Sequence, residues 1–245
     1  MASSSSQIVH PCQHFIPSIY ADKLRVPHDD PVVSRMSGNA CDGVKWYCWA
    51  VFRHFVGESG TWFASSIGTS VRLVEVNLWS TDGNGKPTKA ESVFEVVVTK
   101  EMCNPFGILH GACAGYLLDY CSVTPLVALG YHNGEDGTGL SQSMNIIYHG
   151  AAPIGSKLRI VSASIVLRGR TRICKAEIWS GSKLRMTGIH SLINSPGMTR
   201  LQKRDDDNTQ SSSSLTKRGY SPSSPTRLDV GCSLLLNEIM VQAKL

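Results

Sequence analysis

The sequence lacks several features that would each assign it to a class of protein. It has no C-x-x-C pair among its eight cysteines and no run of more than two consecutive basic residues. No apolar run approaches the ~20 residues that a membrane helix needs, and the N-terminus lacks the charged-then-apolar pattern of a secretory signal. We therefore expect a soluble intracellular protein with no nucleic-acid partner, no membrane span and no metal site.

Charge and cysteine content are moderate. Lys and Arg total 24 against 19 Asp and Glu, a net charge of +5 that is compatible with an anionic small-molecule ligand if the basic residues cluster. Cysteines such as Cys48 and Cys113 sit in apolar runs, where a thiol behaves as a small hydrophobe. This usage predicts a reducing compartment and no disulfide framework.

Polar, low-complexity segments lie at both ends of the 245-residue chain. Residues 1–41 carry a serine run and several prolines without periodicity, and residues 196–245 carry an Asp run, a Ser run and Ser-Pro pairs. Such segments bury too little apolar surface to offset chain entropy. The sequence thus predicts a weakly ordered N-terminal arm, one domain over residues 42–195, and a disordered polar tail.

Within that domain, hydrophobic periodicity predicts two helices and a series of strands. Asp42 is a candidate N-cap for an amphipathic helix over residues 42–56, and Gly57 offers its stop. A helix over about 111–129 is apolar nearly all round, so it must be buried, and Pro125 should end or kink it. The order predicts an α+β fold in which a curved antiparallel sheet wraps around this helix. The expected strands are 71–79, 92–99, 140–148, 158–167, 173–178 and 184–193.

The most informative stretch is residues 104–112, which lead directly into the buried helix. Gly111 and Ala112 open that helix, so their N–H groups belong to its unpaired, positive end. Such donors can stabilise a carbonyl oxygen that becomes anionic during a reaction. Gly111 also lets a substrate approach the backbone closely, because it has no Cβ.

Asp119 is a carboxylate in the middle of this apolar helix. A buried charge needs partners or a task, and the alternatives are catalysis or the capping of a neighbouring loop. Gly111 and Asp119 are eight residues apart, which is ~12 Å along a helix, so one carbonyl cannot touch both. If both act on one substrate, Asp119 comes from a second copy, which predicts a dimer with sites between subunits.

These residues resemble the hotdog-fold acyl-CoA thioesterases of the thioesterase superfamily member and phenylacetate-degradation type. The likeness covers about residues 60–195 and consists of Asn-x-x-Gly-x-x-His-Gly at 104–111, the Asp eight residues later, and the strand 139–148. The resemblance implies that Asn104 positions the attacking water or the thioester and that Gly111, supported by His110, polarises the carbonyl. It also implies that the partner's copy of the aspartate is the general base or the nucleophile, with Ser141 hydrogen-bonding nearby.

The resemblance also places the substrate's coenzyme A portion. It implies contacts from the hairpin tip that carries Arg168, Arg170 and Thr171, and from Ser143 and the Tyr148 loop.

Each site residue has an ordinary structural alternative when taken alone. Asn104 could start a turn, His110 could be a packing histidine, Ser141 an ordinary strand serine, and each Arg part of a solvated strand face.

We therefore expect a homodimer, or a dimer of dimers, that hydrolyses an acyl-CoA thioester to a free carboxylic acid and CoA without metal or redox cofactor. The helix over 42–56 should pack near the acyl channel or cover an open end of the fold. The alternatives are a non-catalytic acyl-CoA binding or sensing protein and a hydratase on the same fold, which the position of the candidate acid within the helix disfavours.

The chain ends in Ala243-Lys244-Leu245, a variant of the Ser-Lys-Leu address that the peroxisomal import receptor reads. This tripeptide predicts a peroxisomal location and that receptor as a partner. The alternatives are a cytosolic location and a terminal Leu that follows a short amphipathic segment by chance.

Overall fold

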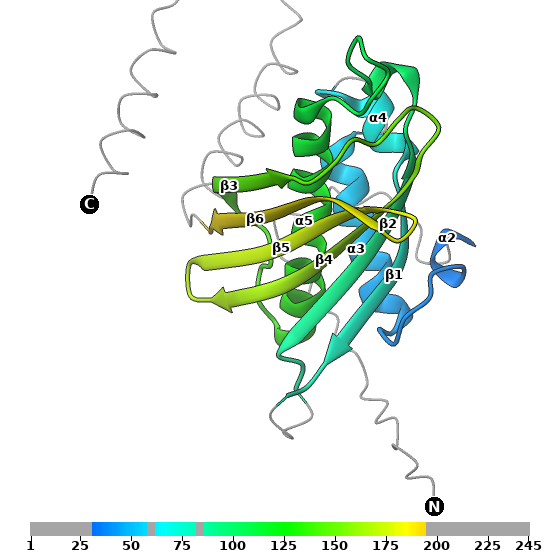
Figure 1. Ribbon diagram of the computed structural model, residues 1–245. Helices are drawn as coiled ribbons and strands as arrows, with labels where there is room; N and C mark the ends of the chain where they lie inside the picture. The colour runs from blue at the N-terminus through cyan, green and yellow to red at the C-terminus, as the bar shows by residue number, and fades with distance from the viewer. Residues whose placement is uncertain (1–30, 58–61, 82–85, 195–245) are drawn as a thin grey trace, which may run out of the picture. The chain divides into compact units, whose positions relative to one another are not determined.

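Six antiparallel strands form one curved sheet that wraps around a long central helix, as Figure 1 shows. The computed structural model describes residues 31–57, 62–81 and 86–194, all of which belong to a compact unit of residues 1–197. Across the sheet, the order is β1 (Arg72–Trp79), β2 (Lys89–Val97), β4 (Lys157–Arg168), β5 (Thr171–Ser180), β6 (Lys183–Ile193) and β3 (Leu140–Tyr148). The two edge strands are therefore β1 and β3. This is the predicted hotdog architecture, and the α+β fold class is confirmed.

The element bounds follow the hydrophobic pattern closely. Four of the strands, β3, β4, β5 and β6, begin and end within two residues of their expected bounds, and β2 begins three residues earlier than expected. The α-helices of the described residues are α2 (Pro31–Ser34), α3 (Asp42–Val56), α4 (Ser65–Ser70) and α5 (Gly111–Asn133).

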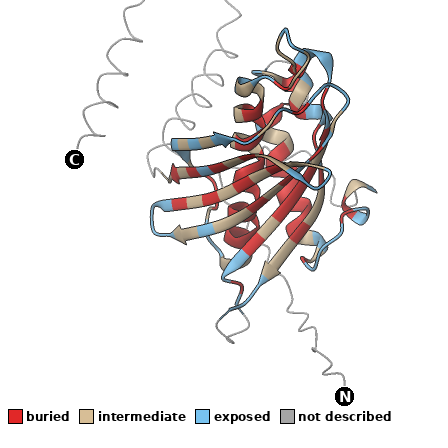
Figure 2. Ribbon diagram, viewed as in Figure 1, coloured by how far each residue is buried: buried red, intermediate tan, exposed pale blue. Residues whose placement is uncertain are grey.

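The core lies where α5 meets the concave face of the sheet and where α3 covers α5. Figure 2 shows the buried positions concentrated along these surfaces, while the edge strand β3 has exposed or half-buried residues along its whole length. Helix α5 is long and apolar enough to cross a bilayer, but about two thirds of its apolar window is buried inside this fold. Its apolarity is therefore explained by its position between α3 and the sheet.

Helix α5 continues through Pro125, which was expected to end or kink it. The helix runs eight residues further and ends at Gly134, whose φ of +76° is the left-handed conformation that glycine adopts most easily. Proline costs the helix one backbone hydrogen bond. Packing of Leu126, Val127 and Leu129 in the core offsets this cost, so tertiary burial overrides the local signal.

The predicted weakly ordered arm is corrected over residues 31–41. Ser37 N–H donates to Val74 O at 2.9 Å, Val76 N–H donates to Ser37 O at 3.2 Å, and the Asn39 side chain bonds the backbone of Leu78. This segment is held against β1 by pairing between residues distant in sequence, which local composition does not report. The rest of the arm, the predicted tail and the terminal Ala243-Lys244-Leu245 lie outside the described residues.

Cys41 is disulfide-bonded, which corrects the expectation that the chain has no disulfide. Spacing along the chain carries no information on such a pairing. The other described cysteines are free thiols: Cys48, Cys103, Cys113, Cys121 and Cys174.

Candidate functional site

Asn104 begins a tight loop that leads to the N-terminus of α5. Its backbone N–H donates to Ile108 O at 2.9 Å, and its side-chain oxygen accepts the N–H groups of Phe106 at 3.0 Å and Ile108 at 3.4 Å. The amide oxygen is therefore engaged in shaping the loop. Only the Nδ2 amide group remains to donate to a substrate or a water.

His110 is the N-cap of α5. Its Nδ1 accepts the Ala112 N–H at 3.0 Å, so one of the two helix-opening donors that the sequence suggested is already occupied. Because Nδ1 accepts, a neutral His110 carries its proton on Nε2. Among the described residues, none accepts from the Gly111 N–H. This end of a 23-residue helix thus keeps the Gly111 N–H as a backbone donor, beside an imidazole donor, at its positive pole.

Tyr148 packs on Gly111. Its hydroxyl donates to Gly111 O at 3.1 Å, and a Cβ at residue 111 would lie 3.3 Å from that hydroxyl oxygen. A side chain at this position would therefore press against the tyrosine. The close approach of strand β3 to the helix N-terminus explains why glycine suits the position.

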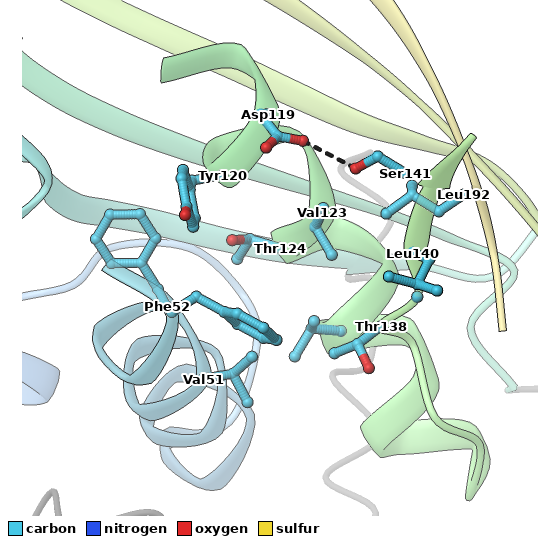
Figure 3. A pocket seen from close by; sticks show the side chains of 13 residues that line it. Val51, Phe52, Asp119, Tyr120, Val123, Thr124, Thr138, Leu140, Ser141 and Leu192 are labelled. Atoms are coloured by element: carbon cyan, nitrogen blue, oxygen red, sulfur yellow. Dashed lines mark hydrogen bonds between the residues drawn. The ribbon is translucent and has the colours of Figure 1, made fainter. Parts of the chain in front are cut away.

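A β-bulge in β3 turns Ser141 toward α5. Ser141 pairs with Leu192, but the next pair is Ser143 with Ser191, so Gln142 is the extra residue. The bulge puts Ser141 and Met144 on the same, concave face although they are three residues apart. As a result Ser141 Oγ donates to Asp119 Oδ1 at 3.1 Å, which Figure 3 shows as a dashed line.

His190 joins this pair, and the sequence interpretation missed it. The ring is 2% exposed, its Nε2 lies 2.9 Å from Ser141 Oγ and 3.4 Å from Asp119 Oδ1, and its Nδ1 lies 2.8 Å from Ser122 Oγ. Three side chains at even-numbered positions of β6 are buried, namely Met186, His190 and Leu192. This alternation could have placed a histidine on the concave face, opposite the helix that carries Asp119.

Hydrogen bonds link these groups in a chain. The Ser141 hydroxyl donates to the Asp119 carboxylate, so His190 Nε2–H donates to Ser141 Oγ. On the other side of the ring, Nδ1 faces Ser122 Oγ, which also lies 3.2 Å from the backbone oxygen of Asp119. In the opposite tautomer the Nε2 lone pair would face Ser141 Oγ and Asp119 Oδ1, and neither oxygen would have a proton to donate to it. Burial lowers the pKa of His190, and the nearby Asp119 carboxylate opposes this effect. The histidine is thus a neutral donor that holds Ser141 and, through it, one carboxylate oxygen.

An apolar cavity of about 190 Å³ adjoins Asp119 and Ser141. Figure 3 shows these two residues at one end of the cavity and Val51 and Phe52 of α3 at the other. Asp119 is 40% exposed, so its carboxylate is accessible from the cavity side. The remaining lining comes from α3, α5, the segment that begins β3, and β6: Phe55, Tyr120, Val123, Thr124, Val127, Thr138, Gly139, Leu140 and Leu192.

The hairpin tip between β4 and β5 is fixed to the loop that follows α5. Arg172, 3% exposed, donates from Nη2 to Asp136 O at 2.6 Å and from Nη1 to Gly169 O at 2.6 Å. Asp136 Oδ1 in turn accepts from the backbone N–H and the hydroxyl of Thr138 at 2.9 and 2.7 Å. The tip is therefore tied to a residue that lines the cavity.

The structure brings some of the predicted site residues together within one chain and separates others. Asp119 and Ser141 are in contact, and Asn104, His110, Gly111 and Tyr148 gather at the N-terminus of α5. These two groups lie eight residues apart on the helix. Ser143 pairs with Ser191 on the convex face, away from Asp119. The tip residues Arg168, Arg170 and Thr171 lie at the opposite end of the sheet from Tyr148, because Thr171 pairs with Ile193 whereas Tyr148 pairs with Met186.

Comparisons with known proteins gave matches among solved structures alone, since no protein-family model and no curated protein matches the chain. Zebrafish thioesterase superfamily member 2 is 22% identical, over 59% of this chain and 94% of its own, with a TM-score of 0.46. The mouse thioesterase superfamily member 2 is 23% identical, over 43% and 81%, with a TM-score of 0.38. A hypothetical thioesterase protein with coenzyme A from Streptococcus pneumoniae is 19% identical, over 42% and 79%, with a TM-score of 0.38.

Proposed function

We propose that this chain, which has the hotdog fold, is an acyl-CoA thioesterase that releases a free carboxylic acid and CoA. The observation that carries the proposal is the Asp119 carboxylate, held by Ser141 and His190 at one end of an apolar cavity. Both contacts fall on Oδ1, and no described residue bonds Oδ2. An accessible carboxylate oxygen beside an apolar cavity suits a base that takes a proton from water next to an acyl group.

The site becomes complete when two copies pair through β3. This strand is an open edge, and Leu140, Ile147 and Tyr148 on it are each about half exposed, a surface that a second strand can cover. Antiparallel pairing of two β3 strands about a twofold axis continues the sheet and sets the two α5 helices antiparallel. Asp119 of one copy then approaches the α5 N-terminus of the other, which resolves the ~12 Å separation within one chain.

The proposed reaction uses groups from both copies. Asp119 Oδ2 takes a proton from a water while the water oxygen attacks the thioester carbonyl carbon. The carbonyl oxygen, now negative, is stabilised by the Gly111 N–H and by His110 Nε2–H of the other copy. The tetrahedral intermediate then expels the CoA thiolate, which receives the proton from Asp119.

The same pairing unites the two halves of the proposed CoA site. Antiparallel pairing places the Leu140 end of one β3 beside the Tyr148 end of the other. The tip with Arg168, Arg170 and Thr171 of one copy then lies at the same end of the joint sheet as Tyr148 of its partner. Guanidinium groups at such a tip suit the phosphates of CoA.

Replacing Asp119 tests the proposal. Asp119→Ala and Asp119→Asn should each lower kcat/KM for acyl-CoA by at least about 10²-fold, followed as release of free thiol. Size-exclusion chromatography should show that both variants remain dimers. Glu91→Gln changes a carboxylate on β2 that lies outside the site, and it should leave turnover within about twofold. A wild-type protein that binds acyl-CoA but releases no thiol would instead be the non-catalytic binding module.

A further inference from the structure

We infer that helix α3 closes the acyl pocket and limits the substrate to short acyl groups, of about six to eight carbons, with Phe52 and Val51 as the residues that set this length. The inference rests on the proposed function and specifies its substrate class. It follows from the place, the size and the rigidity of the cavity beside Asp119.

The place of the cavity makes it the path for the acyl group. A thioester whose carbonyl carbon is attacked from Asp119 Oδ2 has its CoA side directed toward solvent and the α5 N-terminus of the partner. The opposite substituent of that carbon then faces the cavity, whose far end is formed by Val51 and Phe52 (Figure 3). Apart from a few hydroxyl groups, the wall beyond Asp119 and Ser141 is apolar.

The size of the cavity sets the limit. Its volume of about 190 Å³ is below the ~300–1,000 Å³ of pockets that hold drug-sized ligands. An apolar cavity of about 150 Å³ is filled by benzene, a six-carbon molecule. In proportion, this cavity takes about six to eight carbon atoms. A twelve-carbon acyl chain could enter fully only if α3 moved.

The far wall is fixed by packing. Phe52 is 3% exposed, and its ring lies 4.8 Å, centroid to centroid, from that of Phe94 on β2 and 6.2 Å from that of Trp49. Phe94 itself is fully buried. Because a well-packed aromatic side chain has no room to swing aside, the part of the far wall that Phe52 forms does not yield to a longer chain.

The test is a series of straight-chain acyl-CoA substrates of two to sixteen carbons, with benzoyl-CoA as a ring of comparable size. For the wild-type protein, kcat/KM should rise about fourfold per added methylene up to about eight carbons. It should fall at least about tenfold by twelve carbons. The affinity of non-hydrolysable S-alkyl-CoA thioethers should show the same optimum.

Two substitutions should shift the optimum in opposite directions. Phe52→Leu shortens the far wall and should move the optimum up by about two carbons, whereas Val51→Phe fills the cavity and should move it down. A folding defect would lower activity on every substrate and could not produce opposite shifts. Trp79→Ala removes an aromatic side chain that is 43% exposed and does not line the cavity, so it should leave the profile unchanged.

The outcomes separate this inference from the proposed function. Equal hydrolysis of dodecanoyl-CoA and octanoyl-CoA would overturn the length limit while leaving a thioesterase. Thioether binding with an optimum near eight carbons, but without hydrolysis of any thioester, would support the pocket and overturn the proposed activity. Unchanged profiles in both Phe52→Leu and Val51→Phe would show that α3 does not set the length.

Discussion

Replacing His190 should remove a specific part of the pH dependence of stability. The buried ring makes hydrogen bonds of 2.8 Å to Ser122 and 2.9 Å to Ser141, and a net contribution of about 1 kcal/mol each is typical. Asn keeps a donor and an acceptor but is smaller and does not titrate. We expect His190→Asn to lower the free energy of unfolding at pH 8 by about 1–3 kcal/mol.

The direction with pH follows from the lowered pKa of His190, whose largest cause is burial. In the unfolded chain the imidazole takes up a proton near its ordinary pKa of 6.5, while the folded protein resists protonation until a lower pH. The unfolded state then binds more protons, so stability is full above pH 6.5. Below pH 6.5 the free energy of unfolding falls by up to about 1.4 kcal/mol per pH unit, until the pH reaches the pKa of His190 in the folded protein.

Urea unfolding followed by tryptophan fluorescence, at fixed protein concentration between pH 8 and pH 5, measures this effect. The wild-type and His190→Asn curves should converge as the pH falls below 6.5. Asp119→Asn removes the carboxylate that opposes the lowering of the His190 pKa, so this pKa should fall further. The loss of stability that the wild-type protein shows below pH 6.5 should therefore continue to a lower pH in this variant. Parallel wild-type and His190→Asn curves would refute the neutral buried histidine.

Three further predictions concern other parts of the chain. Ser141→Ala should lower kcat about 10–100-fold with KM within twofold, because Asp119 loses the donor that orients it; inactivity equal to that of Asp119→Ala would make the serine a nucleophile instead. Arg172→Ala should cost about 2–3 kcal/mol of stability in thermal or urea unfolding, since it leaves the carbonyls of Asp136 and Gly169 without their donors; a loss below 0.5 kcal/mol, roughly the surface-site value, would contradict this. A fluorescent protein fused to the N-terminus should be punctate in cells, and it should become diffuse when residues 243–245 are deleted; a diffuse signal from the intact chain would rule out the peroxisomal address.

The elements that sequence predicted well are those in which local pattern and burial agree. Strand β3 matches its predicted bounds, residues 140–148, because glycines at 139 and 150 flank a run that ends in β-branched and aromatic residues. Helix α5 begins at Gly111, as predicted, because the loop before it and the apolar run after it are both evident in the sequence. The contact between Asp119 and Ser141 could not be read from either segment alone, since it depends on the bulge in β3.

What the sequence did not provide are contacts between segments far apart in the chain. Two examples are the attachment of residues 31–41 to β1 and the buried position of Arg172, which depend on partners that no local window contains. Arg172, next to the tip residues predicted to meet CoA, donates to backbone carbonyls, because the tip of the hairpin folds back toward the end of α5.

The fixed connection between Asp136, Arg172 and the hairpin tip decides where a reporter can be attached to this protein. An affinity tag or fluorophore inserted near Asp136 would break the bonds to Thr138 and Arg172 and deform the wall of the cavity. The turn between β5 and β6 lies at the other end of the sheet, where Ser182 is exposed, whereas Gly181 beside it has a φ of +58° that favours glycine. A cysteine introduced at Ser182 would therefore carry a label for subunit-exchange measurements without breaking the connection at Asp136.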